Sequence, residues 1–188
     1  MMSSDDDHAL LSRIATGDEG ALQQLFVRYR PPLRRFLWYQ LNRDMAQVED
    51  VLQETFVSVW RAAHTIRAGN SVMAWIFQIA HRHALNVHRR ARSRMEGHAA
   101  SLDLDDECDI PTNSPEDDIL TRLDLHTAIQ NLSDKHREVL YLICLQGFTN
   151  DEVAEILAVP AGTVRSRLSN ARRALHQILE SMRIAEDV

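Results

Sequence analysis

Three polar side chains near position 50 could act together in a catalytic or binding site. Asp50, Gln53 and Glu54 lie three and four residues apart, so they share one face of a helix. Two carboxylates on one face could act as a general acid and a general base. Neither a nucleophile, a metal-binding triad nor a glycine-rich phosphate loop accompanies them in the sequence. The pattern therefore favours a solvated face, or a face that docks on a basic partner helix, over a catalytic site.

Nine histidines raise the question of a metal ion. The densest group comprises His81, His83 and His88. Residues at positions i and i+2 point to different sides of a helix, and the neighbouring arginines repel a cation. The sequence therefore predicts no metal site, and no motif indicates another cofactor or an enzyme.

The most specific local pattern lies between Thr149 and Leu175. Thr149-Asn150-Asp151-Glu152 fits a capping box, which predicts the start of a helix. That helix should end at Ala158-Val159-Pro160, and Gly162-Thr163-Val164 should open a second one. Two short helices joined by a tight turn form a helix-turn-helix, whose second helix enters the major groove of DNA.

The second helix carries the side chains that reading of a DNA groove requires. Its outward positions are Thr163, Arg165, Ser166, Arg167, Ser169, Asn170, Arg172 and Arg173. Arginine can donate two hydrogen bonds to guanine, asparagine can pair with adenine, and small hydroxyls reach phosphate. A helical hairpin with a merely solvated face is the competing interpretation. Four arginines without one acid between Val164 and Ile178 argue against it, because a solvated face normally mixes charges.

An aromatic side chain stands in a second basic segment. Trp75 begins a predicted helix whose other faces hold Gln78, Arg82, Asn86, Arg89 and Arg90. Bases of a single strand stack on exposed rings while cations follow the phosphates, so this helix is a candidate surface for single-stranded nucleic acid. Core packing is the competing interpretation of the tryptophan.

The periodicity of the apolar residues predicts an all-α fold. They recur at intervals of three and four, and alternating β-branched runs are few. Gly17 should end a first short helix, and Pro31-Pro32 should kink or split a second. A third helix should follow Asp44, and Ser71 should cap a fourth.

The charge of the chain is segregated along the sequence. The formal net charge of -6 argues against nucleic acid, because proteins that bind polyanions are usually basic. Residues 1–94 carry +4, residues 95–125 carry -9, and residues 126–188 carry -1. The excess of acid therefore lies in the middle, where periodicity is lost and Pro111 and Pro115 stand, which predicts a flexible linker.

This organisation predicts two small helical domains, at residues 1–95 and 115–188, joined by an acidic linker at 96–114.

No apolar run approaches the ~20 residues that span a bilayer, and the acidic N-terminus is unlike a secretory signal. We therefore expect a cytoplasmic protein without membrane insertion. Cys108 and Cys144 fit neither a disulfide framework nor a zinc-finger spacing.

Four stretches in order resemble the extracytoplasmic-function, or group IV, sigma factors of bacterial RNA polymerase. They are Asp50–Trp60, Ala74–Ala80, His136–Leu140 and Gly162–Leu168. The resemblance covers nearly the whole chain and implies the same layout, with sigma region 2 and a helix-turn-helix region 4 joined by a linker. It also implies an alternative-type factor of the stress-response kind, which supplies promoter specificity while the polymerase performs the chemistry.

The resemblance implies roles for particular residues. The β′ clamp helices of core polymerase would contact Asp50, Val51, Gln53, Glu54, Val57 and Trp60. Unpaired bases of the −10 element would contact Arg67, Asn70, Ser71, Trp75, Gln78, Arg82, Asn86, Arg89 and Arg90. The helix from Thr163 to Arg173 would read the −35 element as duplex. The implied partners are core polymerase with its β′ clamp helices and β flap, promoter DNA, and an anti-sigma factor that could hold the chain at the inner membrane.

Departures from the family pattern affect both DNA surfaces. The family often has Asn and Asp where Arg82 and Asn86 stand, and a basic residue within Ser169-Asn170. Ala158 replaces the glycine of the helix-turn-helix, and alanine adopts the left-handed conformation reluctantly, so we expect a distorted turn. A helix-turn-helix regulator that acts without polymerase is the main alternative, and it would need neither the Asp50–Trp60 face nor the Trp75 helix.

Overall fold

The computed structural model of the chain describes residues 4–67, 69–95 and 127–186. Helices and helical turns make up all of its regular structure, and the described residues contain no strand, in agreement with the predicted all-α class. The N-terminal elements are α1 (Ser4–Ala15), α2 (Glu19–Gln40), α3 (Met45–Ala62), the 3-10 turn η1 (Ala63–Thr65) and α4 (Val72–Met95). The C-terminal elements are α6 (Asp134–Leu140), the π-helical turn η3 (Tyr141–Leu145), α7 (Asn150–Leu157) and α8 (Ala161–Glu186). The predicted linker and the start of the second domain, up to residue 126, lie outside the described residues.

Side-chain caps begin the helices of the N-terminal half. The Asp18 carboxylate accepts a hydrogen bond from the Ala21 amide at 3.0 Å, and the Asp44 carboxylate accepts one from the Gln47 amide at 3.1 Å. The Ser71 hydroxyl accepts one from the Ala74 amide at 3.2 Å, so the cap predicted for the fourth helix is confirmed. The pKa of Asp44 is lowered, chiefly because the Gln47 amide favours the ionised carboxylate.

Helix α2 continues through Pro31 and Pro32, so the expectation that these prolines split it is wrong. Proline at 31 leaves the carbonyl of Val27 without its helical donor, but Val27 is 63% exposed and water can take the donor's place. Leu25, Leu33 and Phe36 are buried along the same helix, before and after the proline pair. Burial of this continuous apolar face outweighs the bonds that the prolines remove.

The helix-turn-helix forms as the sequence predicts. Thr149 and Glu152 exchange side-chain and backbone hydrogen bonds in a capping box that begins α7. Ala158 ends α7 in the left-handed conformation, with φ 52° and ψ 46°. The expectation of a distorted turn is therefore wrong: Ala158 adopts the left-handed conformation that a glycine would allow, at a steric cost to the alanine side chain.

We expect Ala158→Gly to stabilise the chain by about 0.5–1 kcal/mol. Glycine removes a left-handed penalty of about 1–2 kcal/mol but increases the freedom of the unfolded chain by about 0.4–1 kcal/mol. Urea denaturation of both proteins measures the difference. Ala161→Gly, within the first turn of α8, serves as the control and should destabilise the chain, because that position has right-handed helical geometry.

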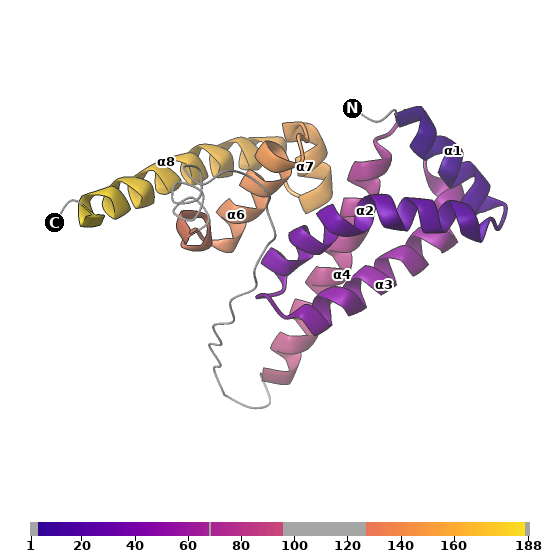
Figure 1. Cartoon of the computed structure of the whole chain (residues 1–188), viewed down its shortest axis with the longest axis horizontal. Helices are drawn as coiled ribbons and strands as arrows, with labels where there is room; N and C mark the ends of the chain where they lie inside the picture. The colour runs from indigo at the N-terminus through magenta and orange to yellow at the C-terminus, as the bar shows by residue number, and fades with distance from the viewer. Residues whose placement is uncertain (1–3, 68, 96–126, 187–188) are drawn as a thin grey trace.

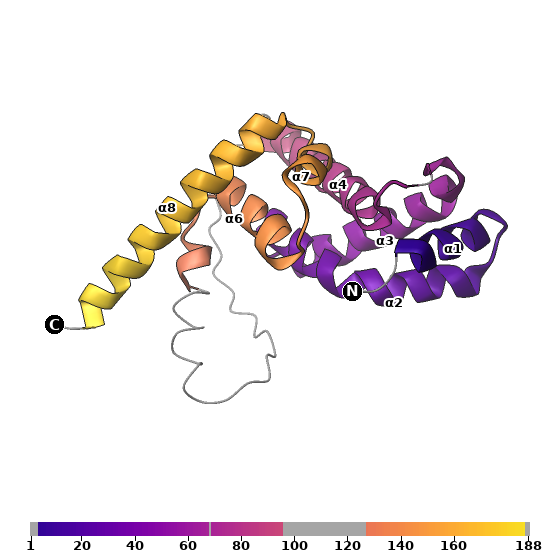
Figure 2. The ribbon, with the colours of Figure 1, turned by 90° about the horizontal axis from the view of Figure 1, so that it is seen from above.

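The two halves of the chain share one hydrophobic core. Phe77 of α4 meets Phe148 edge to face with ring centroids 5.2 Å apart, and Phe36 of α2 stacks on Tyr141 at 6.1 Å. The Tyr141 hydroxyl donates to the carbonyl of Pro32 at 2.8 Å, and burial raises the pKa of this tyrosine. Figures 1 and 2 show α7 beside α4, with α8 running away from the N-terminal helices toward the C-terminus.

Candidate functional site

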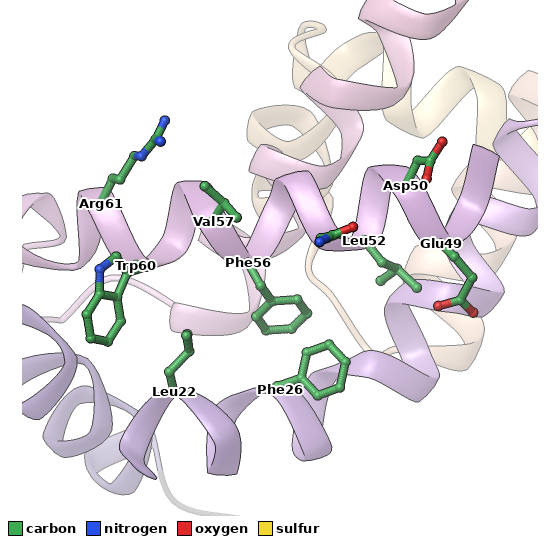
Figure 3. Close-up of a pocket in the computed structure, with 10 residues that line it drawn as sticks. Leu22, Phe26, Glu49, Asp50, Leu52, Phe56, Val57, Trp60 and Arg61 are labelled. Atoms are coloured by element: carbon green, nitrogen blue, oxygen red, sulfur yellow. The ribbon is translucent and has the colours of Figure 1, made fainter. Parts of the chain in front are cut away.

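A groove of about 720 Å³ lies between α2 and α3 (Figure 3). Its apolar wall is formed by Leu22, Phe26, Leu52, Phe56, Val57 and Trp60. Glu49, Asp50, Gln53 and Arg61 complete the lining. Phe26 and Phe56 meet edge to face with centroids 4.9 Å apart, which holds the two helices together beneath the opening. The groove can take apolar side chains beside a polar rim.

The exposed strip of α3 continues this groove. Asp50, Gln53 and Glu54 are all exposed, as their shared face predicts. Val57 is 43% exposed, and Trp60 is partly buried in the groove wall. Val51 is 1% exposed and packs in the core, so it is corrected from a contact residue to a core residue. The helical period that turns Val57 outward turns Val51 inward.

The acids of this face differ in their partners. Glu49 forms ion pairs with Arg30 at 3.1 Å and with Arg34 at 3.2 Å, so two guanidinium groups already surround it. Glu54 lies 3.1 Å from the Nδ1 atom of His83 on α4.

The α2 side of the groove was not predicted from the sequence, although Leu22 and Phe26, four residues apart, share one helical face.

The residues predicted to contact single-stranded nucleic acid gather along one end and one side of α4. Arg67 and Asn70 are exposed in the loop before the helix, and Ser71 caps it. Trp75, Gln78 and Asn86 are partly buried, whereas Arg82, Arg89 and Arg90 are exposed. Spacings of three and four place the aromatic and the cations on connected faces of the helix.

Helix α1 braces the loop that precedes α4. The His8 side chain donates a hydrogen bond from Nε2 to the carbonyl oxygen of Asn70 at 2.9 Å. Asp7 lies behind it, where it pairs with Arg28 and accepts a hydrogen bond from the Tyr29 hydroxyl on α2. No sequence pattern pointed to His8, because its partner is a backbone atom 62 positions away.

The C-terminal half covers part of α4. Gln78 donates from Nε2 to the carbonyl of Glu155 on α7 at 3.1 Å. Glu138 of α6 accepts a hydrogen bond from Gln40 and lies 3.3 Å from Nδ1 of His81. A cavity of about 440 Å³ lies between the two halves, and Arg167 lines it. In this arrangement Gln78 and Arg167 face the other half of the chain.

Most of the predicted recognition residues on α8 are free of that interface. Val164 and Ala171 are buried and point inward, away from the predicted outward positions. The exposed side chains are Arg165, Ser166, Ser169, Asn170, Arg172 and Arg173. Thr163 and Arg167 are partly buried. An arginine-rich face on the second helix of a helix-turn-helix can enter a DNA groove.

The described residues hold no group of three or more His, Cys, Asp or Glu side chains placed to bind a metal ion. His81 and His83 instead contact Glu138 and Glu54, respectively. Among the described helices, none has the length and apolar character to cross a membrane.

The two halves match two family descriptions. Sigma-70 region 2 matches residues 25–94, and Sigma-70 region 4 matches residues 122–175. Among curated relatives, the RNA polymerase sigma-H factor of Pseudomonas aeruginosa is 28% identical over 97% of this chain and 98% of its own length. The ECF RNA polymerase sigma factor SigL of Mycobacterium tuberculosis is 30% identical over 93% of this chain and 97% of its own.

Two solved structures, one of them of a sigma factor, show the same fold. RpoE of Bartonella quintana, in complex with the anti-sigma factor NepR, has a TM-score of 0.67 and 27% identity over 84% of this chain and 96% of that one. CnrH, in complex with the cytosolic domain of CnrY, has a TM-score of 0.65 and 25% identity over 94% of this chain and 99% of that one. The chain belongs to the extracytoplasmic-function sigma factors of the sigma-70 family.

Proposed function

We propose that this chain binds core RNA polymerase through the α2–α3 groove and directs it to promoters with a −10 and a −35 element. The observation that carries the proposal is that one chain exposes two arginine-rich surfaces of different chemistry. The α4 surface combines an aromatic ring with cations, which suits unpaired bases, and the α8 surface is an arginine-rich groove-reading helix. The polymerase performs the synthesis, and this chain supplies promoter specificity without enzymatic activity of its own.

The docking face suits a basic, amphipathic partner such as the β′ clamp helices. Asp50 and Glu54 offer carboxylates on the exposed strip of α3, and Gln53 offers an amide between them. Val57 and Trp60 add apolar surface next to these polar groups. Apolar anchors surrounded by complementary charge are typical of stable protein interfaces. The β flap is the proposed second contact of core polymerase, on the C-terminal domain.

Capture of unpaired bases would drive strand opening. Unstacking costs a few kcal/mol per base step, and stacking on an aromatic side chain returns about 1–3 kcal/mol per base. Trp75 provides such a ring, while Arg82, Arg89 and Arg90 would hold the phosphates of the displaced strand. The loop from Arg67 to Ser71 would receive the base that leaves the stack.

An anti-sigma factor is a proposed partner. The solved complexes of RpoE with NepR and of CnrH with the cytosolic domain of CnrY support it by similarity of fold and sequence. An anti-sigma factor with a membrane segment would hold this chain at the inner membrane until a stress signal releases it, and the chain itself would act in the cytoplasm.

A pull-down with core polymerase, followed by run-off transcription on promoter DNA, tests the function. We expect a stable complex and transcripts that start at defined sites. Binding to a palindromic DNA site without polymerase, with no complex and no transcripts, would instead identify a free-standing helix-turn-helix regulator. Mapping of transcripts after overexpression would then define the promoter sequence.

We expect His8→Ala to reduce promoter opening about threefold to tenfold while leaving duplex binding at the −35 element unchanged. The substitution removes the hydrogen bond to the Asn70 carbonyl, worth about 0.5–1.5 kcal/mol, and frees the loop that would hold the flipped base. Permanganate reactivity of the −10 thymines in the polymerase complex measures opening. Ser12→Ala is the matched control on α1, because the Ser12 hydroxyl bonds only its own helix at the carbonyl of His8. Equal loss in both variants would contradict the bracing role.

A further inference from the structure

A hydrogen bond and an ion-pair contact join the docking helix α3 to α4. The Ser58 hydroxyl lies 2.9 Å from Nε2 of His83, and Nδ1 of the same ring lies 3.1 Å from Oε2 of Glu54. Glu54 and Ser58 are four residues apart on α3, so both reach the imidazole from one helical face. The His83 side chain is 22% exposed and that of Glu54 is 52% exposed.

The acceptor-only chemistry of a carboxylate fixes the proton positions. Glu54 can only accept, so the hydrogen of the neutral ring belongs on Nδ1 of His83, the nitrogen that faces the carboxylate. In the neutral ring Nε2 is then the acceptor, and the Ser58 hydroxyl donates to it. Both ring nitrogens are engaged, and the orientation of the imidazole is therefore set from both sides.

A carboxylate, a histidine and a serine in this order also form the catalytic triad of many hydrolases. The surroundings of Ser58, however, do not suit catalysis. A hydrolase also needs backbone or side-chain donors aimed at the oxyanion next to the nucleophile. Ser58 lies inside α3, four residues before its last residue, where the nearby amides donate to carbonyls four residues back. The arrangement therefore holds side chains in place and supplies no oxyanion site.

We propose that His83 is a positioning residue for polymerase docking, which it serves by holding the Glu54 carboxylate in its binding orientation. This inference rests on the proposed function, since it requires that Glu54 contacts polymerase. A half-exposed glutamate normally samples several rotamers, so its ordering on binding costs conformational entropy. The contact with His83 at 3.1 Å orders the side chain before the partner arrives, while its exposure leaves the carboxylate accessible. The sequence motif around Glu54 gives no hint of this, because His83 is on the next helix.

Substitution of His83 by asparagine or by glutamine separates its contact with Glu54 from its hydrogen bond with Ser58. The amide nitrogen of asparagine takes the place of Nδ1 and can still donate to Glu54, whereas that of glutamine takes the place of Nε2 and reaches Ser58. Titration of labelled full-length chain with core polymerase measures the affinity. We expect His83→Gln and His83→Ala to weaken it about threefold to tenfold, and His83→Asn to stay within about twofold of the wild type. His88→Gln is the control on the same helix, since His88 bonds the carbonyl of Gln40, and it should leave the affinity unchanged.

A double-mutant cycle distinguishes positioning from a general loss of stability. In the Glu54→Ala background, His83→Gln should cause no further loss of polymerase affinity, because the carboxylate that it orders is gone. Equal effects of His83→Asn and His83→Gln, or additive effects in the cycle, would overturn the positioning role. A wild-type chain that does not bind polymerase would overturn the proposed function itself. Normal wild-type binding with no effect of Glu54→Ala would refute this inference alone.

Discussion

Replacing Phe77 with alanine should lower the free energy of unfolding by about 3–5 kcal/mol, the range for a fully buried phenylalanine. Phe77 is 0% exposed. Its ring lies 5.1 Å from that of Phe36 and 5.2 Å from that of Phe148, so it touches both halves of the chain. The substitution leaves a cavity where α2, α4 and the segment before α7 meet. We therefore expect it to destabilise both halves together.

Guanidinium denaturation followed by circular dichroism and by tryptophan fluorescence measures this effect. All three tryptophans, Trp38, Trp60 and Trp75, lie in the N-terminal half, whereas circular dichroism reports on all helices. Coincident transitions that shift together would show that the shared core makes the chain one cooperative unit. Val27→Ala on exposed α2 surface is the control and should change stability by less than about 0.5 kcal/mol. A shift in fluorescence alone would contradict the shared core.

Replacing Arg165 and Arg172 together with alanine should abolish most of the discrimination at the −35 element. The two residues are seven positions apart, so they lie on one face of α8, and both are exposed. A bidentate contact to guanine contributes about 1–3 kcal/mol of discrimination. If both arginines read bases, the polymerase complex of the double variant should bind its best −35 duplex at least about thirtyfold less tightly than the wild-type complex.

Binding of the polymerase complex to matched and scrambled −35 duplexes, at several salt concentrations, tests this expectation. Arg165→Lys retains the charge but not the planar pair of donors, so it should lose discrimination while keeping the salt dependence. Gln177→Ala, exposed further along the same helix, is the control. Equal loss of affinity on matched and scrambled duplexes would show that these arginines contact only phosphates.

Local chemistry made much of the fold predictable. The capping box at Thr149, the Ser71 cap and the end of the first helix before Gly17 all appear where the sequence places them. These signals act within a few residues and do not depend on the rest of the fold. The inward positions of the helix-turn-helix follow equally from the period of 3.6 residues. Ala158 kept the left-handed turn that its side chain disfavours, because the flanking helices fix the backbone there.

The candidate surfaces were predictable in part. Periodicity places Asp50, Gln53 and Glu54 on an exposed face, and the same periodicity argues that Val51 is buried, as it is. The α2 half of the groove required knowledge of which helix packs on α3. His8 and His83 act through partners on other elements, so no local pattern identifies them.

Most helices, their caps, the exposed arginines of α8 and the membership of the family could be predicted from the sequence, because these depend on local propensity and on order along the chain. The continuity of α2 through two prolines depends instead on packing, since burial of its apolar face by α3 and α4 outweighs the missing bonds. Packing also gives the two halves a shared core through Phe77 and Phe148, and it brings His83 to 3.1 Å from Glu54. Such contacts join residues far apart in sequence, and their free energy arises only when folding brings the side chains together.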